Sequence, residues 1–367
     1  MDSFELPLAS AQAPADAALA DLTSFRIGGR PARLIDCHTE AQVVAAVAEA
    51  DDAGAPLLAI GGGSNLLAAE RLDNLVVVRD RRGLCRAEER AGAVHLTVQA
   101  GASWDAVVAL TVQRGWAGLA ALSGIPGSAG ATAVQNIGAY GAEVGQMIES
   151  IRAFDRHRQT IVELRQDQLD WSYRDSALKR SLAAGAGPTP RWVVLDLTFK
   201  LPVDRGGSPV NYEQLAASLG VKNGDQAPLA AIRQAVTEIR RAKGMILDPD
   251  DHDTWSAGSF FTNPVIDASA AAGLPPAAPQ YPANGLVKTS AAWLITNAGI
   301  HRGEGVREGA AATTSTKHVL ALTNRGGATC ADILELAEWI ADRVKDRFGI
   351  ALTREPVLVD VRAPAAS

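Results

Sequence analysis

The first eighty residues contain one helical and two strand-like runs of apolar residues. Valines at 43, 44 and 47 recur at helical spacing after Thr39-Glu-Ala-Gln42, a capping-box sequence, and Gly54 and Pro56 end the run. Two short apolar runs, 57–60 and 75–78, have the length and composition of buried strands. This pattern predicts a small α+β unit built around the glycine-rich segment between the two strands.

From residue 94 onward the pattern changes to strands of period two. Predicted strands lie at 94–98, 151–154 and 192–199, with one helix at about 103–114. Another helix is expected over 228–243, because Pro228 stands at its first turn and Gly244 follows its end. The chain therefore contains a second part that is rich in β-sheet.

The acidic segment 247–253 opens a third part. Helices are expected there at 290–297 and at 332–347, the latter with Thr329 as its cap, and the Pro- and Ala-rich stretch 268–282 is expected to be a surface loop. The predicted fold class is α+β with three parts. These parts are 1–84, to which 348–367 returns, then 85–245, and finally 246–347.

Composition narrows the class of protein. A chain of 367 residues exceeds what one core usually supports, so two or three domains are expected. A formal charge of −6 argues against a nucleic-acid binder. The three cysteines are scattered and form no metal-ligand spacing, which favours a reducing compartment and no metal site. We find no signal-like start and no run long enough to span a membrane, so we expect an intracellular protein.

Two tracts of small residues, 59–67 and 122–141, are candidate ligand-binding walls, because glycine runs are costly unless the backbone turns sharply or lies against a ligand. In the first, Gly61-Gly-Gly-Ser-Asn65 follows a predicted strand and could form a nest of N–H groups for a pyrophosphate. It lacks the third glycine and the following helix of the dinucleotide fingerprint. A purely structural turn is the alternative.

The second tract suits a flat ring. Its small side chains leave space, Ile125 and Ile137 offer apolar faces, and Gln135 and Asn136 offer amide hydrogen bonds, as an isoalloxazine ring requires. The alternative is close packing of two elements through small residues.

Four motifs carry a resemblance to a known family. They are Gly-Ile-Pro-Gly at 124–127, Val-Gln-Asn-Ile-Gly-Ala-Tyr-Gly at 134–141, Tyr-Arg-Asp-Ser at 173–176 and Ala-Gly-Ser-Phe-Phe-x-Asn-Pro at 257–264. In order and spacing the chain resembles UDP-N-acetylenolpyruvoylglucosamine reductase, from Ser24-Phe-Arg-Ile-Gly-Gly29 to Glu355. Asn211-Tyr-Glu-Gln-Leu215 is similar to the tyrosine loop of its longer subtype.

The resemblance implies a three-domain flavoprotein with an FAD-binding fold of the vanillyl-alcohol-oxidase type and a substrate-binding domain. Its cofactor would be non-covalent FAD, its co-substrate NADPH and its substrate a nucleotide sugar, with no nucleic-acid or membrane partner. The implied protein is a cytoplasmic monomer that makes a peptidoglycan precursor for cell-wall growth and division. Reduction of the enolpyruvyl group would place hydride on C3 and a proton on C2.

The resemblance also assigns residues. Ser259 would be the proton donor, Arg174 would face the substrate carboxylate or the flavin, and Glu355 would bond to the developing enediolate. Without the family match Ser259 would be a strand-edge hydroxyl, and Arg174 could simply pair with Asp175 at the surface. Many relatives carry an arginine where this chain has Val357, which puts that part of the pattern in doubt.

Cofactor and substrate contacts complete the predicted site. The expected cofactor-binding residues are Gly61, Gly62, Gly63, Ser64, Asn65, Ile125, Gly127, Gln135, Asn136, Ile137 and Gly138. The expected substrate-binding residues are Tyr140, Tyr173, Tyr212, Arg240, Lys243, Asn263 and Asn297. For Arg240 and Lys243, which are three apart near a helix end, interaction with the helix dipole is the alternative, and for Tyr212 it is core packing.

Two other functions remain open at this level. An FAD-dependent sugar-lactone or alcohol oxidase would share the fold, but none of the six histidines lies in a glycine tract where it could tether flavin. A flavin- or nucleotide-sugar-binding sensor would have lost its catalytic residues, whereas Ser259, Arg174 and Glu355 are all present.

Overall fold

The computed structural model describes residues 2–10, 12–204 and 206–360. The chain divides into two compact units. Unit 1 consists of the described residues of Met1–Ala17, Pro31–Gly63 and Asp73–Arg241, and unit 2 of those of Ala18–Arg30, Ser64–Leu72 and Ala242–Ser367. The three-part division expected from the sequence stays a prediction, and residues 361–367 of its returning segment lie outside the described residues.

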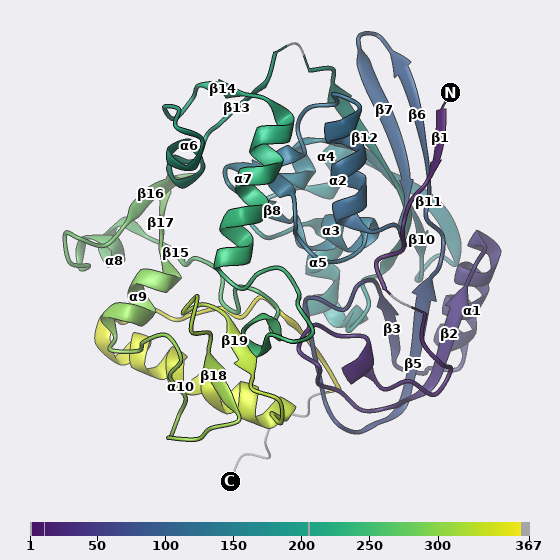
Figure 1. Ribbon diagram of the computed structural model, residues 1–367. Helices are drawn as coiled ribbons and strands as arrows, with labels where there is room; N and C mark the ends of the chain where they lie inside the picture. Colours follow the sequence, from purple (N-terminus) through teal and green to yellow (C-terminus); the bar gives the residue numbers. More distant parts are fainter. Residues whose placement is uncertain (1, 11, 205, 361–367) are drawn as a thin grey trace. The chain divides into compact units, whose positions relative to one another are not determined.

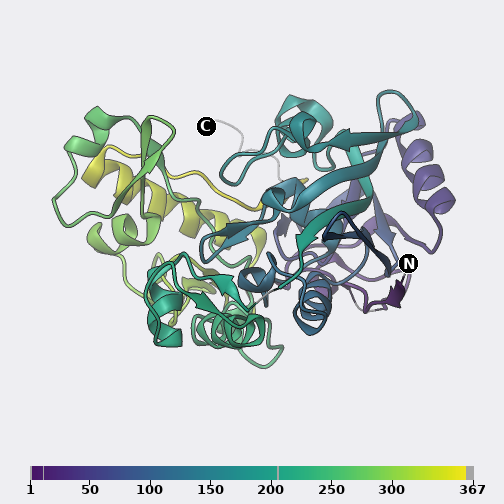
Figure 2. The same ribbon diagram turned by 90° about the horizontal axis from the view of Figure 1, so that it is seen from above.

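A six-stranded antiparallel sheet forms the centre of unit 1 (Figure 1). Its order is β1 (Asp2–Glu5), β6 (Leu84–Arg90), β7 (Ala93–Gln99), β12 (Trp192–Pro202), β10 (Ile148–Asp155) and β11 (Thr160–Arg165). Alternation places Val94, Leu96 and Val98 of β7 in the core, while His95 and Thr97 point to the opposite, polar face. The twist of this sheet is visible in Figure 2.

Helices α2 (Trp104–Gln113) and α3 (Ala129–Gln135) cover the apolar face of that sheet. Val107 of α2 and Ala133 of α3 are fully buried in the same core as β7. Because α3 lies within the second glycine tract, its small residues let the helix approach the sheet closely; a Cβ on Gly130 would lie 2.7 Å from that of Ala100.

A smaller sheet of unit 1 contains β2 (Pro31–Cys37), β5 (Leu72–Asp80) and β3 (Leu57–Ile60), and β3 pairs in parallel with β5. Helix α1 (Glu40–Asp52) packs on it through a separate core that includes Val43 and Val47. The predicted capping box is present, since the Thr39 side chain accepts a hydrogen bond from Gln42 N and the Gln42 side chain bonds back to the cap.

Another core of unit 1 contains α7 (Leu229–Ala242), whose buried face includes Ile232 and Val236. The other elements of this unit are η2 (Ala120–Leu122), β8 (Gly138–Ala139), β9 (Ala142–Glu143), η3 (Val144–Gln146), α4 (Gln166–Leu169), α5 (Ala177–Ser181), η4 (Leu182–Ala186), β13 (Ser208–Pro209), α6 (Glu213–Leu219) and β14 (Gln226–Ala227). The helix predicted at 228–243 is thus confirmed, but Lys243 follows its last residue.

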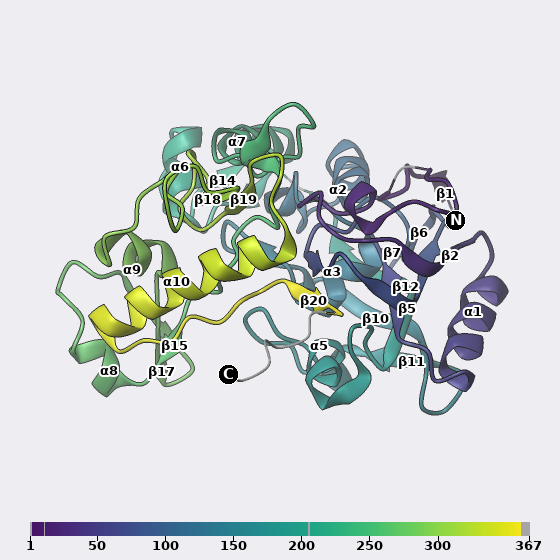
Figure 3. The same cartoon turned by 90° about the horizontal axis from the view of Figure 1, so that it is seen from below.

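Unit 2 is organised on α10 (Cys330–Phe348), which packs against α9 (Ala291–Asn297) (Figure 3). Thr329 caps α10 as predicted, by accepting a hydrogen bond from Asp332 N. The other elements are η1 (Leu19–Asp21), β4 (Leu66–Ala68), η5 (His252–Thr254), β15 (Val265–Ile266), α8 (Ala268–Ala272), β16 (Gln280–Ala283), β17 (Leu286–Thr289), β18 (Ala312–Thr314), β19 (Leu322–Asn324) and β20 (Val357–Val359). Strand β20 pairs in parallel with β4, so Val357 is part of a ladder.

One predicted element is wrong and several were missed. The stretch 268–282, expected to be a loop, contains α8 and part of β16, because Ala271 is buried and Leu274 and Ala278 belong to the hydrophobic core of unit 2. Strands β6 and β11 carry many charged residues on one face, which conceals them from a search for apolar runs. The predicted helices and strands elsewhere are confirmed to within a few residues.

Candidate functional site

The two glycine tracts meet in unit 1. A Cβ on Gly61 would lie 2.2 Å from Ser128 Oγ, and one on Gly62 would lie 2.7 Å from Gly127 Cα. A side chain at position 61 would displace the Ser128 hydroxyl, and one at position 62 would meet backbone, so the contact between the tracts requires glycine at position 62. The two alternatives considered for the tracts, a structural turn and packing through small residues, therefore both describe features of this contact.

The first tract continues into unit 2, where Ser64 and Asn65 join it to the C-terminal segment. Asn65 O accepts a hydrogen bond from Val357 N at 3.0 Å, and Asn65 Nδ2 donates to Glu355 O at 3.4 Å. Ser24 Oγ donates to Ser64 O at 3.4 Å. The end of the glycine loop therefore helps to hold the backbone around Glu355.

In the second tract, Gln135 and Asn136 have different surroundings. Asn136 is in the left-handed conformation at the end of α3 (φ 41°). Its amide oxygen accepts from Gly145 N at 3.1 Å and its amide nitrogen donates to Ser172 O at 2.7 Å. By contrast, Gln135 Oε1 is buried and has no hydrogen-bond partner among the described residues. A buried acceptor of this kind fits an N–H group of a bound ligand.

The turn at Gly124 is bonded on both sides by side chains that we did not single out in the sequence or to which we gave another role. Asp105 Oδ1 accepts from Gly124 N at 2.7 Å, and Arg240 Nε donates to Gly124 O at 3.0 Å. Arg233 of α7 forms a two-pronged ion pair with Asp105, at 2.7 and 2.8 Å. The seven-residue spacing of Arg233 and Arg240, two helical turns, was the available signal.

Arg174 lies in a tight turn with φ 55° and points back to the second tract. Its Nη2 donates to Gly138 O at 2.6 Å, and its guanidinium carbon is 5.3 Å from the centre of the Tyr173 ring. Asp175 pairs instead with Arg180. The alternative of a simple Arg174–Asp175 surface pair is therefore not what the structure contains.

Arg240 is the most deeply buried cation of this region, with 9% of its surface exposed. Burial lowers the pKa of its guanidinium, the neighbouring Tyr140 and Asp105 oppose that shift, and the like charge of Arg174 adds to it. Two arginines thus lie close enough to interact beside one glycine tract. An anionic group would relieve their repulsion.

Tyr212 touches the end of the same tract. Its ring meets that of Tyr140 edge to face, with 5.5 Å between ring centres, and 42% of Tyr212 is exposed. A Cβ on Gly141 would lie 2.7 Å from Asn211 O, so the backbone before Tyr212 lies directly on this glycine. Burial raises the pKa of Tyr140, against the effect of Arg240.

Ser259 and Glu355 lie on adjacent segments of unit 2. Glu355 N donates to Phe260 O at 2.8 Å, and Phe261 forms an antiparallel bridge with Arg354. Phe260 and Phe261 are buried anchors on either side of this pairing, while Ser259 and Glu355 are half-buried. The backbone pairing therefore joins the segment that follows Ser259 to the segment that contains Glu355.

The side-chain amides of Asn263 and Asn297, both predicted to bind substrate, have hydrogen-bond partners within the chain. Asn263 Oδ1 accepts from Ala291 N at 3.0 Å at the start of α9, and Asn297 Nδ2 donates to Trp293 O at 2.9 Å. Asn297 is exposed. Their predicted contacts with substrate remain predictions.

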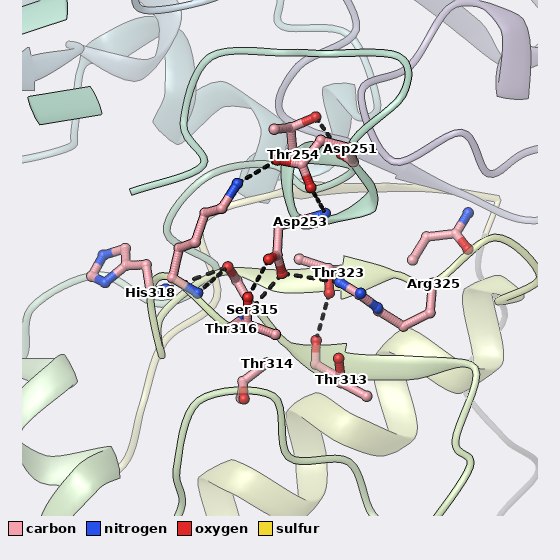
Figure 4. A network of polar contacts seen from close by, with 12 residues as sticks. Asp251, Asp253, Thr254, Thr313, Thr314, Ser315, Thr316, His318, Thr323 and Arg325 are labelled. Atoms are coloured by element: carbon pink, nitrogen blue, oxygen red, sulfur yellow. Dashed lines mark hydrogen bonds and ion pairs between the residues drawn. The ribbon is translucent and has the colours of Figure 1, made fainter. Parts of the chain in front are cut away.

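The acidic segment 247–253 is tied to the turn at 315–318 (Figure 4). Asp253 accepts from Thr316 N and from Arg325 Nη1, each at 2.9 Å, and Asp251 pairs with Lys317. This turn carries His318, whose pKa is lowered to about 4 by burial and by the charges of Lys243 and Arg302. Lys243 therefore lies near a histidine that is neutral at physiological pH.

The predicted residues fall into two groups. Unit 1 holds Gly61, Gly62, Gly63, Ile125, Gly127, Gln135, Asn136, Ile137, Gly138, Tyr140, Tyr173, Arg174, Tyr212 and Arg240, and unit 2 holds Ser64, Asn65, Lys243, Ser259, Asn263, Asn297 and Glu355. Among the described residues, no cluster of three His, Cys, Asp or Glu side chains could hold a metal ion.

Comparison with known proteins identifies the family of this chain. Residues 31–165 match the model of an FAD binding domain, and residues 248–359 match that of the C-terminal domain of UDP-N-acetylenolpyruvoylglucosamine reductase. The reductase of Nocardia farcinica is 48% identical over 94% of this chain and 89% of its own length. The chain belongs to the UDP-N-acetylenolpyruvoylglucosamine reductase family.

Other members of this reductase family support the assignment. The Streptomyces avermitilis reductase is 47% identical, with 94% of each chain covered. The crystal structure of the Thermus caldophilus reductase has the same fold, with a TM-score of 0.60 and 23% identity over 94% of this chain and 97% of its own. The predicted α+β fold with a vanillyl-alcohol-oxidase-type FAD-binding domain is confirmed, as is the prediction of an FAD-dependent reductase over an oxidase.

The residues of unit 1 fit the flavin of this reductase family. The backbones of Gly62 and Gly127 lie against each other and form a surface without side chains. Ile125 and Ile137 are half-buried apolar residues of the same tract as Gly127. Gln135 Oε1 is a buried acceptor without a hydrogen-bond donor among the described residues. These features match a flat, amide-bearing ring.

Proposed function

We propose that this protein reduces UDP-N-acetylenolpyruvoylglucosamine to UDP-N-acetylmuramate with NADPH as the electron source. The observation that supports the proposal is the backbone pairing, within unit 2, of Phe260 and Phe261, which follow Ser259, with Glu355 and Arg354. FAD, when bound, supplies two-electron chemistry by accepting hydride from NADPH and delivering it to C3 of the enolpyruvyl group.

The chain's own residues handle the charge and the proton. As C3 gains hydride, the electron pair of the double bond moves to C2, where Ser259 Oγ donates its proton and later regains one from solvent. The carboxyl O–H of Glu355 donates a hydrogen bond to the enediolate-like oxygens that develop on the neighbouring substrate carboxyl group. The product is the lactyl ether.

The cations of unit 1 suit the binding of the anionic substrate. Arg174, aimed at the second glycine tract, binds the enolpyruvyl carboxylate or lies against the flavin, and Arg240 adds positive charge behind it. The exposed Tyr212 covers the diphosphate, and Lys243 binds another anionic group of the nucleotide sugar. Tyr140, Tyr173, Asn263 and Asn297 complete the proposed substrate contacts.

Ser259→Ala separates the two halves of this reaction. In an anaerobic stopped-flow experiment, we expect NADPH to bleach the flavin band at the parental rate. Return of the band on adding the enolpyruvyl substrate should then slow by about 10²- to 10⁴-fold, because the proton donor is missing. Ser269→Ala, an exposed serine of α8 bonded to Asp267, is the matched control.

The outcomes are distinct. Parental reoxidation in Ser259→Ala would remove Ser259 from the mechanism. A parental protein whose flavin is reduced by NADPH but never reoxidised by the enolpyruvyl substrate would overturn the proposed function itself.

We also propose that the reaction takes place in the cytoplasm, on a monomer, as a step toward the cell wall needed for growth and division. Cys37, Cys85 and Cys330 are free and buried, which suits a reducing compartment. No helix of the described chain is both long and apolar enough to cross a membrane. Light scattering should return a mass near 38.3 kDa, whereas twice that value would contradict the monomer.

A further inference from the structure

The peptide unit of Gly124 is held from two sides. Asp105 Oδ1 accepts its N–H at 2.7 Å, and Arg240 Nε donates to its carbonyl oxygen at 3.0 Å. Gly124 has φ 69° and directly precedes Ile125 and Gly127 of the predicted cofactor site. A glycine can leave this conformation at little cost, so its neighbours must define the turn.

Asp105 is itself held in place. It lies in the first turn of α2, and the guanidinium of Arg233 in α7 donates hydrogen bonds to both carboxylate oxygens, at 2.7 and 2.8 Å. Burial alone would raise the pKa of Asp105, but the hydrogen bonds from Arg233 and Gly124 hold it below its usual value. The side chain is therefore a carboxylate at neutral pH.

The same carboxylate also offsets charge. Asp105 interacts with the buried guanidinium of Arg240, which feels the like charge of Arg174. Loss of Asp105 would leave Gly124 N–H without this acceptor and Arg240 with less counter-charge. Both changes act on the residues that shape the turn.

We propose that Asp105, oriented by Arg233, is a positioning residue that shapes the Gly124–Gly127 turn for the flavin. The inference rests on the FAD binding of the proposed function and adds a role for α2 and α7 in it. Asp105 acts on the flavin only through the glycine turn and through Arg240. Its loss should therefore weaken the binding of FAD itself.

The test compares three variants by titrating flavin-free protein with FAD and recording the flavin spectrum. Asp105→Ala should raise the Kd for FAD about tenfold or more and shift the visible flavin band, because a charge-assisted hydrogen bond to the turn is lost. Arg233→Met should have a smaller effect, because Asp105 can still accept from Gly124. Asp51→Ala is the matched control: it removes a similar two-pronged pair, with Arg156 of the same unit, far along the sequence from the tract.

Each outcome decides. An unchanged Kd and spectrum in Asp105→Ala would overturn the inference, and so would an equal loss of FAD affinity in Asp51→Ala, because the effect would then be a general loss of stability. If Asp105→Ala does not fold, Asp105→Asn replaces it; this change keeps an acceptor for Gly124 but removes the charge, and should weaken FAD binding and shift the band less. Failure of the parental protein to bind FAD would instead refute the proposed function.

Discussion

At the scale of single residues, the buried charges of this reductase are matched to backbone carbonyls of one glycine tract. Arg174 donates to Gly138 O and Arg240 to Gly124 O. A guanidinium has five donors in a planar fork, which suits the recognition of carbonyl and carboxylate oxygens. Side chains of the tract itself supply little charge, and the cations come from distant segments of unit 1.

His318 provides a pH test at this scale. Its pKa in the folded protein is lowered to about 4, mainly by burial and then by Lys243 and Arg302, against about 6.5 in the unfolded chain. Between these values the unfolded state binds more protons than the folded one. The protonation of His318 therefore leaves the free energy of unfolding unchanged above about pH 6.5. It lowers that free energy as the pH falls toward 4, by up to about 3 kcal/mol.

Replacement of His318 by Gln removes this proton uptake. Urea unfolding of the parental protein and of His318→Gln at pH 7.5 and pH 5 should show a smaller acid loss in the variant. Equal losses in both proteins would show that His318 does not bind protons differently in the two states.

At the scale of elements, the glycine tracts function as surfaces packed on each other. The loop after β3 meets the residues before α3 at Gly62 and Gly127, where backbone atoms leave no space for a side chain. Helix α3, which follows this contact, is short and made mostly of small residues, and Gln135 and Asn136 stand at its C-terminal end. The contact between the two tracts therefore depends both on where these residues lie and on how small they are.

Gly62→Ala tests this packing. The added Cβ would lie 2.7 Å from Gly127 Cα, so the two tracts must move apart. We expect destabilisation of about 1–3 kcal/mol in urea unfolding and a clear loss of FAD affinity in titration. Gly327→Ala, where a Cβ meets nothing within 4 Å, is the control and should bind FAD normally. Parental FAD affinity in Gly62→Ala would show that this contact does not shape the cofactor site.

At the scale of the whole molecule, each unit has a hydrophobic core of its own. The core of unit 1 joins β7 and β12 to α2 and α3, and that of unit 2 joins α9 and α10 to Phe25 and Phe260. A ligand that binds the folded chain but not the unfolded chain stabilises the folded state by mass action.

Removal of FAD should therefore lower the thermal midpoint, and added FAD should restore it in a concentration-dependent way. At a free FAD concentration of about 100 Kd the gain in unfolding free energy is about 2.7 kcal/mol. Scanning calorimetry of flavin-free protein over a range of FAD concentrations measures this. A midpoint that does not respond to FAD would contradict specific binding to the folded state.

The sequence by itself determined the local elements and the ligand class. The capping boxes at Thr39 and Thr329 and the apolar runs of β3 and β12 act over a few residues, so their signals are complete within short windows. The two glycine tracts and their neighbouring motifs were sufficient to predict FAD and the reductase family. Strand β11 escaped because its apolar residues are mixed with charged ones, and helix α8 escaped because it is only five residues long.

Only the tertiary structure decided which side chains meet. Asp105 reaches Gly124 and Arg233 across 19 and 128 residues, and Glu355 reaches Phe260 across a separation that no local pattern encodes. It also showed that the amide of Asn136 is bonded within the chain, while the buried Gln135 Oε1 has no hydrogen-bond partner among the described residues. Such pairings depend on how helices and strands pack, because packing brings together groups whose separation along the chain carries no periodic signal.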